Sequence, residues 1–134
     1  MHDFTGECLC GAVRYRLRAE APQAMFLCHC SRCRKETGSI HGANVFFRSG
    51  ALSFERGEEL LTRYALAGTR KQRRFCSTCG SPMPLRGEDG HIVLPAGSLD
   101  DDRSLEPTAH IFCASEASWT HKAANAERLL EGPT

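Results

Sequence analysis

Eight cysteines constrain this chain of 134 residues more than any other feature, because seven of them fall into three close groups. The densest group is the run Cys28-His29-Cys30-Ser31-Arg32-Cys33. Three thiolates this close can hold one zinc ion and leave its fourth position open, as catalytic zinc sites do. The residues alone also leave two alternatives open: a closed structural site completed by a distant ligand, and a redox disulfide with one spare thiol.

The other two groups suggest a second metal site of a different kind. Cys8 and Cys10 form a C-x-C pair, and Cys76 and Cys79 form a C-x-x-C-G knuckle with Gly80. Two pairs supply the four thiolates that close a structural zinc site. We therefore expect Cys8, Cys10, Cys76 and Cys79 to bind a structural zinc ion. That assignment leaves Cys28, Cys30 and Cys33 to bind a second zinc ion at an open, catalytic site.

Size and charge narrow the class of protein. A chain of 134 residues is long enough to bury a conventional core, and we expect a single domain over residues 1–134. The net charge of +1 gives no reason to expect nucleic acid or a membrane surface as a partner. The sequence contains no apolar run of about 18 residues and no secretory signal at its start. We expect a cytoplasmic protein, and in that compartment clustered cysteines are more often metal ligands or catalytic groups than disulfides.

Several further side chains are candidates for minor roles. Cys113 stands alone in an apolar segment and is expected to be a small core residue rather than a ligand. If its segment is extended, His29 points away from its neighbours. His41 and His110 are candidates for substrate contact, with an ordinary surface or core position as the alternative. The cations closest to the cysteine trio are Arg32, Arg34 and Lys35.

The rest of the pattern predicts mainly strands. Over residues 12–18 the apolar side chains of Val13, Tyr15 and Leu17 alternate with three arginines. This pattern is typical of a half-buried strand with one solvent-exposed basic face. Further strands are expected over residues 25–27, 44–47, 52–54, 60–66, 91–94 and 110–113. We expect an irregular exposed loop between the cysteine trio and Gly42, and one or two turns of helix over residues 123–130.

These motifs together resemble the glutathione-dependent formaldehyde-activating enzyme family, also called the centromere protein V family. The motifs that carry the resemblance are Gly6-x-Cys8-x-Cys10-Gly11, Cys28-His29-Cys30-Ser31-Arg32-Cys33-Arg34-Lys35-x-x-Gly38-Ser39, Phe75-Cys76-x-x-Cys79-Gly80, Gly97-Ser98-Leu99-Asp100 and His110-Ile111, with Trp119 beyond. The resemblance implies an all-β fold of the β-tent type, built of small antiparallel sheets pinned by zinc. It also implies the same division of the cysteines into a structural site and a more labile active-site zinc.

The function expected from the sequence is a zinc-dependent carbon–sulfur lyase that condenses a small thiol such as glutathione with an aldehyde such as formaldehyde. The activity itself is implied by the resemblance, while zinc binding also follows from the cysteine spacing. Two alternatives stay open: a non-catalytic zinc module that binds a partner, and a redox-responsive thiol site.

Overall fold

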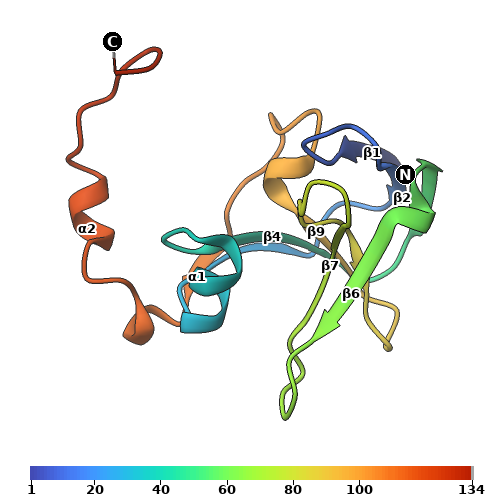
Figure 1. The fold of residues 1–134 in the computed structure, drawn as a ribbon, viewed down its shortest axis with the longest axis horizontal. Helices are drawn as coiled ribbons and strands as arrows, with labels where there is room; N and C mark the ends of the chain where they lie inside the picture. Colours follow the sequence, from blue (N-terminus) through green and yellow to red (C-terminus); the bar gives the residue numbers. More distant parts are fainter. Residues whose placement is uncertain (134) are drawn as a thin grey trace. The chain divides into compact units, whose positions relative to one another are not determined.

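The computed structural model describes residues 1–133, which form mostly short strands arranged in three small sheets (Figure 1). The strands are β1 (His2–Glu7), β2 (Arg14–Ala19), β3 (Ala24–Cys28), β4 (Gly42–Phe47), β5 (Ala51–Arg56), β6 (Leu61–Ala65), β7 (Gln72–Cys76), β8 (Leu85–Arg86), β9 (Ile92–Pro95) and β10 (Ala109–Ile111). The helices are α1 (Ser31–Thr37) and α2 (Thr120–Ala123), with 3-10 turns η1 (Glu58–Leu60), η2 (Ala96–Ser98) and η3 (Cys113–Ser115). The expected all-β class is confirmed.

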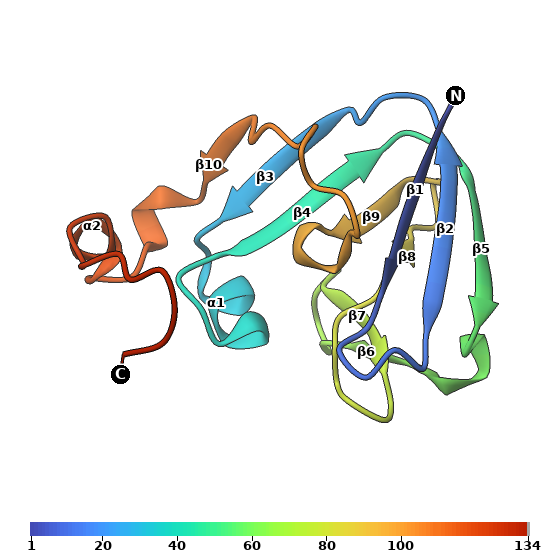
Figure 2. The same ribbon diagram turned by 90° about the horizontal axis from the view of Figure 1, so that it is seen from above.

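The strand orders are β1-β2-β5, β10-β3-β4-β9-β8 and β6-β7. Figure 2 shows β1, β2 and β5 side by side, and these strands pair antiparallel. β4 with β9, β8 with β9, and β6 with β7 are also antiparallel. The described residues divide into two compact units, one of residues 1–26 and 43–109 and the other of residues 27–42 and 110–133. The expectation of a single domain stays a prediction.

The core of the first unit follows from the alternation along β2. Tyr15 and Leu17 are fully buried and face the buried side chains of β4 and β9, among them Phe47, Ile92 and Leu94. Burying each large side chain of this kind stabilises the fold by about 1.5–3 kcal/mol. The buried Tyr15 hydroxyl keeps a partner, because the Ser98 hydroxyl, 2.7 Å away, already donates to the Pro95 carbonyl and therefore accepts from Tyr15.

The arginines on the other face of β2 are paired with acidic side chains. Arg14 lies 2.7 Å from Asp100 and 3.3 Å from Glu55, and Arg16 lies 3.5 Å from Glu55. Asp100 also accepts from the Thr5 hydroxyl at 2.8 Å, so it ties β1 and β2 to the segment after η2. The basic face expected from the sequence is therefore neutralised and offers little net charge to an anionic partner.

Three local expectations were wrong. The segment between the cysteine trio and Gly42 is not irregular throughout: residues 34–37 belong to α1, in which Cys30 is the N-cap and Gly38, at φ 65°, ends the helix, and only residues 38–41 are irregular. Cys113 is exposed rather than part of the core, since Phe112 takes φ 57° and turns the chain out of β10 into η3. The expected helix over residues 123–130 is replaced by α2, which is only four residues long.

Gly57 provides a direct test of how tightly the first unit is packed. It has φ 80°, and a Cβ there would collide with the Ala12 carbonyl oxygen. Gly90 has φ 89° with open space around its Cβ position. Gly90→Ala should therefore cost only the backbone strain, about 1–2 kcal/mol. Gly57→Ala should cost about 1–3 kcal/mol more because the backbone of Ala12 must also move. Urea unfolding of both variants measures the difference, and equal losses would contradict the close approach.

Asp100 gives a prediction for pH dependence. The hydrogen bonds from Arg14 and Thr5 hold the pKa of Asp100 below its ordinary value. A lowered pKa in the folded state stabilises the fold at neutral pH, and this contribution is lost as the pH falls through that pKa. Asp100→Asn should thus destabilise by up to about 1 kcal/mol at pH 7, because solvent screens a partly exposed pair.

The stability difference between Asp100→Asn and the natural chain should begin to shrink below about pH 4, where Asp100 of the unfolded natural chain is protonated, and should vanish as the pH falls through the lower pKa of the folded state. Unfolding at several pH values measures it, and release of metal in acid affects both chains alike. The exposed neighbour Asp102 supplies a control, because Asp102→Asn should leave the stability unchanged. A difference for Asp100→Asn that stayed constant down to pH 3 would contradict the ion pair.

Candidate metal centres

The first unit brings together the four cysteines expected to form a structural site. The Sγ atoms of Cys8, Cys10, Cys76 and Cys79 all lie within 4.8 Å of one another. Four sulfurs about 2.3 Å from a tetrahedral zinc ion would be separated by about 3.8 Å. Cys8 and Cys10 approach this value, with their Sγ atoms 3.6 Å apart. The arrangement therefore fits a tetrahedral metal ion such as zinc.

The hydrogen bonds around these sulfurs favour the thiolate form at some positions and oppose it at another. The Val13 N–H lies 3.3 Å from Cys8 Sγ, and the pKa of Cys8 is lowered because this bond and those with Cys10 and Cys76 outweigh burial and the opposing bond with Cys79. The pKa of Cys10 is instead raised to about 11, because burial and the other three cysteines outweigh the bond from the Ala12 backbone. The hydrogen bond between Cys79 and Ser81, at 3.2 Å, lowers the pKa of Cys79 to about 5. In the thiol form Cys79 donates to the Ser81 oxygen, which also accepts the Leu9 N–H at 3.0 Å; once Cys79 is ionised, the Ser81 hydroxyl can donate its own proton to the sulfur.

The turns that carry the two pairs are fixed by their own backbone bonds. Cys76 donates its N–H to the Ser81 carbonyl at 3.0 Å, and Gly80 donates to the Cys76 carbonyl at 2.7 Å. Arg73 binds the Gly80 carbonyl at 2.8 Å and stacks its guanidinium over Phe75, 5.5 Å from the ring centre. This cation beside the knuckle offsets part of the negative charge that four thiolates bring.

The second unit brings together the remaining trio. The Sγ atoms of Cys28, Cys30 and Cys33 lie within 4.8 Å of one another, and within residues 1–133 no other Cys, His, Asp or Glu ligand atom joins them. Cys28 and Cys33 are buried, at 8% and 7% exposure, whereas Cys30 is partly exposed. The set fits a metal ion that keeps one position for an outside ligand.

The local sequence explains how three cysteines so close in the chain can converge. Cys28 is the last residue of β3. Cys30 is the N-cap of α1 and has an extended backbone, with φ −64° and ψ 156°. The first turn of α1 then brings Cys33 back, and its N–H donates to Cys30 Sγ at 3.3 Å. This bond helps to lower the pKa of Cys30, although burial acts in the opposite direction.

Three histidines of the second unit lie close together. The His29 ring is 5.1 Å from His41 and 5.0 Å from His110, measured between ring centres. Burial lowers the pKa of His29, and the charges of His41 and His110 lower it further. The sequence offered His41 and His110 only as separate candidates for substrate contact and did not reveal that they share one cluster with His29.

Arg34 is engaged in the structure rather than free for a substrate. Its Nε donates to the His29 carbonyl at 3.4 Å, and its guanidinium donates to the Ser115 carbonyl at 3.1 Å. Arg32 and Lys35, by contrast, are exposed on α1. Of the three cations that the sequence offered near the trio, only these two keep exposed side chains.

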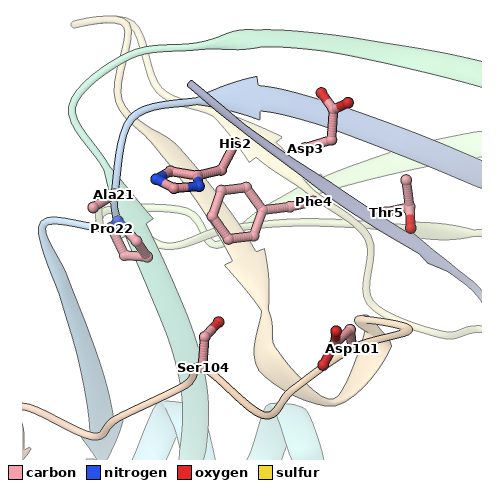
Figure 3. Close-up of a pocket in the computed structure, with 8 residues that line it drawn as sticks. All are labelled: His2, Asp3, Phe4, Thr5, Ala21, Pro22, Asp101 and Ser104. Carbon is pink, nitrogen blue, oxygen red and sulfur yellow. The ribbon is translucent and has the colours of Figure 1, made fainter.

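A cavity of about 350 Å³ lies in the first unit, where His2, Phe4, Pro22 and Ser104 are among the lining residues (Figure 3). Its carboxylates are matched by cations, because Asp3 lies 3.7 Å from Arg16 and Asp101 lies 2.8 Å from Arg103. No cysteine lines this cavity. Its chemistry therefore gives it no part in the metal centres.

Comparison with known proteins identifies the family of the chain. The family described as glutathione-dependent formaldehyde-activating enzyme matches residues 3–115. The chain belongs to this family. A relative from Halomonas elongata named "Putative glutathione-dependent formaldehyde-activating enzyme" is 30% identical over 124 residues, which cover 85% of this chain and 77% of the relative. The resemblance stated from the motifs is thereby confirmed.

A solved structure supports the same fold. The crystal structure of a Rhodobacter sphaeroides protein is 27% identical, with a TM-score of 0.62, and the match covers 79% of this chain and 98% of that one. The fold of small sheets expected from the family motifs is thus found in an experimental structure as well. Among residues 1–133, no helix has the length and apolar character needed to cross a membrane.

The two cysteine groups should respond differently to the loss of one ligand. Cys76 is fully buried in the core, and structural zinc contributes about 10–16 kcal/mol of apparent binding free energy. Cys76→Ser should therefore release one metal ion and unfold the first unit. Cys30→Ser should release the other metal ion with little loss of stability, because serine is itself a preferred N-cap and keeps the start of α1.

Metal analysis and thermal unfolding of both variants test this division. The exposed Cys113 supplies a matched control, and Cys113→Ser should keep both metal ions and the natural melting temperature. An equal loss of stability in Cys30→Ser and Cys76→Ser would contradict the division into two kinds of site.

Proposed function

We propose that this protein is a zinc-dependent carbon–sulfur lyase that joins a small thiol of the glutathione type to an aldehyde such as formaldehyde. The observation that carries the proposal is the set of three cysteines, Cys28, Cys30 and Cys33, without a fourth protein ligand in the described part of the chain. Four-ligand sites serve structure, whereas three-ligand sites leave a position for a reactant. Membership of the family supports glutathione and formaldehyde as the reactants.

Both predicted zinc ions belong to this proposal. Cys8, Cys10, Cys76 and Cys79 would hold the structural ion, and Cys28, Cys30 and Cys33 would hold the catalytic one. A zinc ion with an exchangeable position lowers the pKa of a bound thiol and holds it ready for attack on a carbonyl carbon. The three cysteines would fix that position, and the partly exposed Cys30 would leave it accessible to solvent.

The reaction needs no oxidant or reductant. The thiol sulfur bonds to the aldehyde carbon, the π electron pair of the carbonyl group moves to its oxygen, and the proton lost by the thiol returns to that oxygen. One thiol and one aldehyde thus give one S-hydroxyalkyl product. On the protein side, Arg32 and Lys35 lie on the surface of α1, where they would attract the carboxylates of a glutathione-like thiol.

The proposal is tested by following the exchange of formaldehyde with glutathione by NMR in the presence of catalytic amounts of the protein. The exchange should be faster than the uncatalysed reaction, and Cys30→Ser should abolish the acceleration. Cys113→Ser, whose side chain is exposed and outside the trio, should retain the natural rate. Natural rates in Cys30→Ser would contradict the assignment of the site.

Metal retention separates this function from its alternatives. Two zinc ions per chain, one removed by mild chelation and protected by glutathione, are expected for an open site that binds a thiol. One zinc ion that glutathione does not affect would favour a non-catalytic module or a trio held as a disulfide.

A further inference from the structure

His29 lies between two of the predicted metal ligands and is the most deeply buried titratable side chain near them. It is 1% exposed, and apart from Tyr15 and the cysteines no other side chain with a polar or charged group falls in the buried class among residues 1–133. Burying a polar group is unfavourable unless hydrogen bonds compensate for the lost water. The position of this residue therefore needs an explanation beyond space filling.

Three hydrogen bonds hold His29, two through its backbone and one through its ring. Its N–H donates to the Ile111 carbonyl at 2.9 Å, and its carbonyl accepts from Arg34 Nε at 3.4 Å. Its Nε2 lies 2.8 Å from Nδ1 of His110. His110 and Ile111 are neighbours in β10, so one strand holds both the backbone and the ring of His29.

The unpartnered ring nitrogen indicates the direction of the bond between the two histidines. Nδ1 of His29 is buried and has no hydrogen-bond partner. If His110 were the donor, a neutral His29 would carry its proton on this buried Nδ1, and an unpaired buried N–H is costly. The favourable arrangement places the His29 proton on Nε2, which donates to Nδ1 of His110.

The ring of His29 is not part of the sulfur group, because its nitrogens are not among the ligand atoms that lie within 4.8 Å of one another there. Cys28 ends a strand and Cys30 is extended, and successive side chains of an extended chain alternate in direction. We therefore infer that the ring points away from the sulfurs of Cys28 and Cys30. It can act on the metal centre only through the backbone that carries these two ligands.

We propose that the hydrogen bond between His29 and His110 is a positioning device that holds Cys28 and Cys30 in the geometry required by the metal ion. The inference rests on the metal binding of the trio in the proposed function, but not on its substrate. Groups that orient metal ligands without touching the metal typically account for 10–100-fold in affinity. A fixed backbone has less conformational freedom to lose when the ion binds, and this is the source of the gain.

A purely structural histidine would behave differently. His29→Phe keeps an aromatic ring, slightly larger than imidazole, and removes a buried polar group, while the exposed His110 can bind water instead, so the chain should still fold. His110→Leu removes the acceptor at an exposed position, whereas His110→Gln can accept the same proton through its side-chain oxygen. A packing role predicts natural metal affinity in all three variants, and a positioning role predicts loss in two of them.

The experiment is a competition titration of the purified full-length chain at pH 7.5 with Zn²⁺ against a chromophoric chelator, under reducing conditions. The four-cysteine site of the same molecule serves as the internal reference. His29→Phe and His110→Leu should weaken the second zinc site at least about tenfold and leave the first unchanged. His110→Gln should bind within about threefold of the natural chain. When the trio site is loaded with Co²⁺, the absorption spectra of His29→Phe and His110→Leu should differ from that of the natural chain, whereas His110→Gln should keep the natural spectrum.

The failure of this inference can be told apart from the failure of the proposed function. Natural affinity at the second site in both His29→Phe and His110→Leu, or equal weakening of both sites, would overturn the positioning role alone. If the natural chain binds two zinc ions but does not accelerate the exchange of formaldehyde with glutathione, the proposed function fails and the positioning role still stands on the affinities. A natural chain that binds only one zinc ion would overturn both.

Discussion

Mutual repulsion among clustered thiolates is the constraint on which the rest of this structure depends. Four sulfurs within 4.8 Å of one another cannot all ionise unless positive charge lies between or beside them. The Val13 N–H, the Ser81 hydroxyl and Arg73 provide part of this compensation from outside the group. None of them lies among the sulfurs, and a metal ion bound between the four thiolates would supply the remaining positive charge.

Much of this organisation could be predicted from the sequence because it depends on short-range patterns. Cysteine spacing predicted which cysteines lie together, and alternation along β2 separated Tyr15 and Leu17 from the arginine face. Helix α1 could not be predicted in the same way. Its N-cap is Cys30, a residue that is not among the usual caps, and its seven residues are too few for a helical period to show. Gly38 was the only conventional signal, and it marks only the end of the helix.

The errors at Cys113 and in the histidine cluster have a different cause, since both depend on contacts distant in sequence. A run of Ile111, Phe112 and Cys113 is typical of a strand, yet Phe112 adopts a left-handed conformation that few large residues accept, and the strand ends there. His29 and His110 are 81 positions apart and meet only because β10 pairs beside the end of β3. No local pattern contains that information.

The two metal centres differ in a way that follows from how each is built. The four-cysteine group takes its ligands from two turns far apart in the chain, so a metal ion there would close a long loop and stabilise the fold. The trio takes all its ligands from six consecutive residues, so a metal ion there adds little loop closure. Its geometry must come from elsewhere: the N-cap bond of Cys30 and the bonds that tie His29 to β10 supply it. A site that contributes little to folding can keep an open position and exchange its ligand without endangering the fold, which a reactive centre requires.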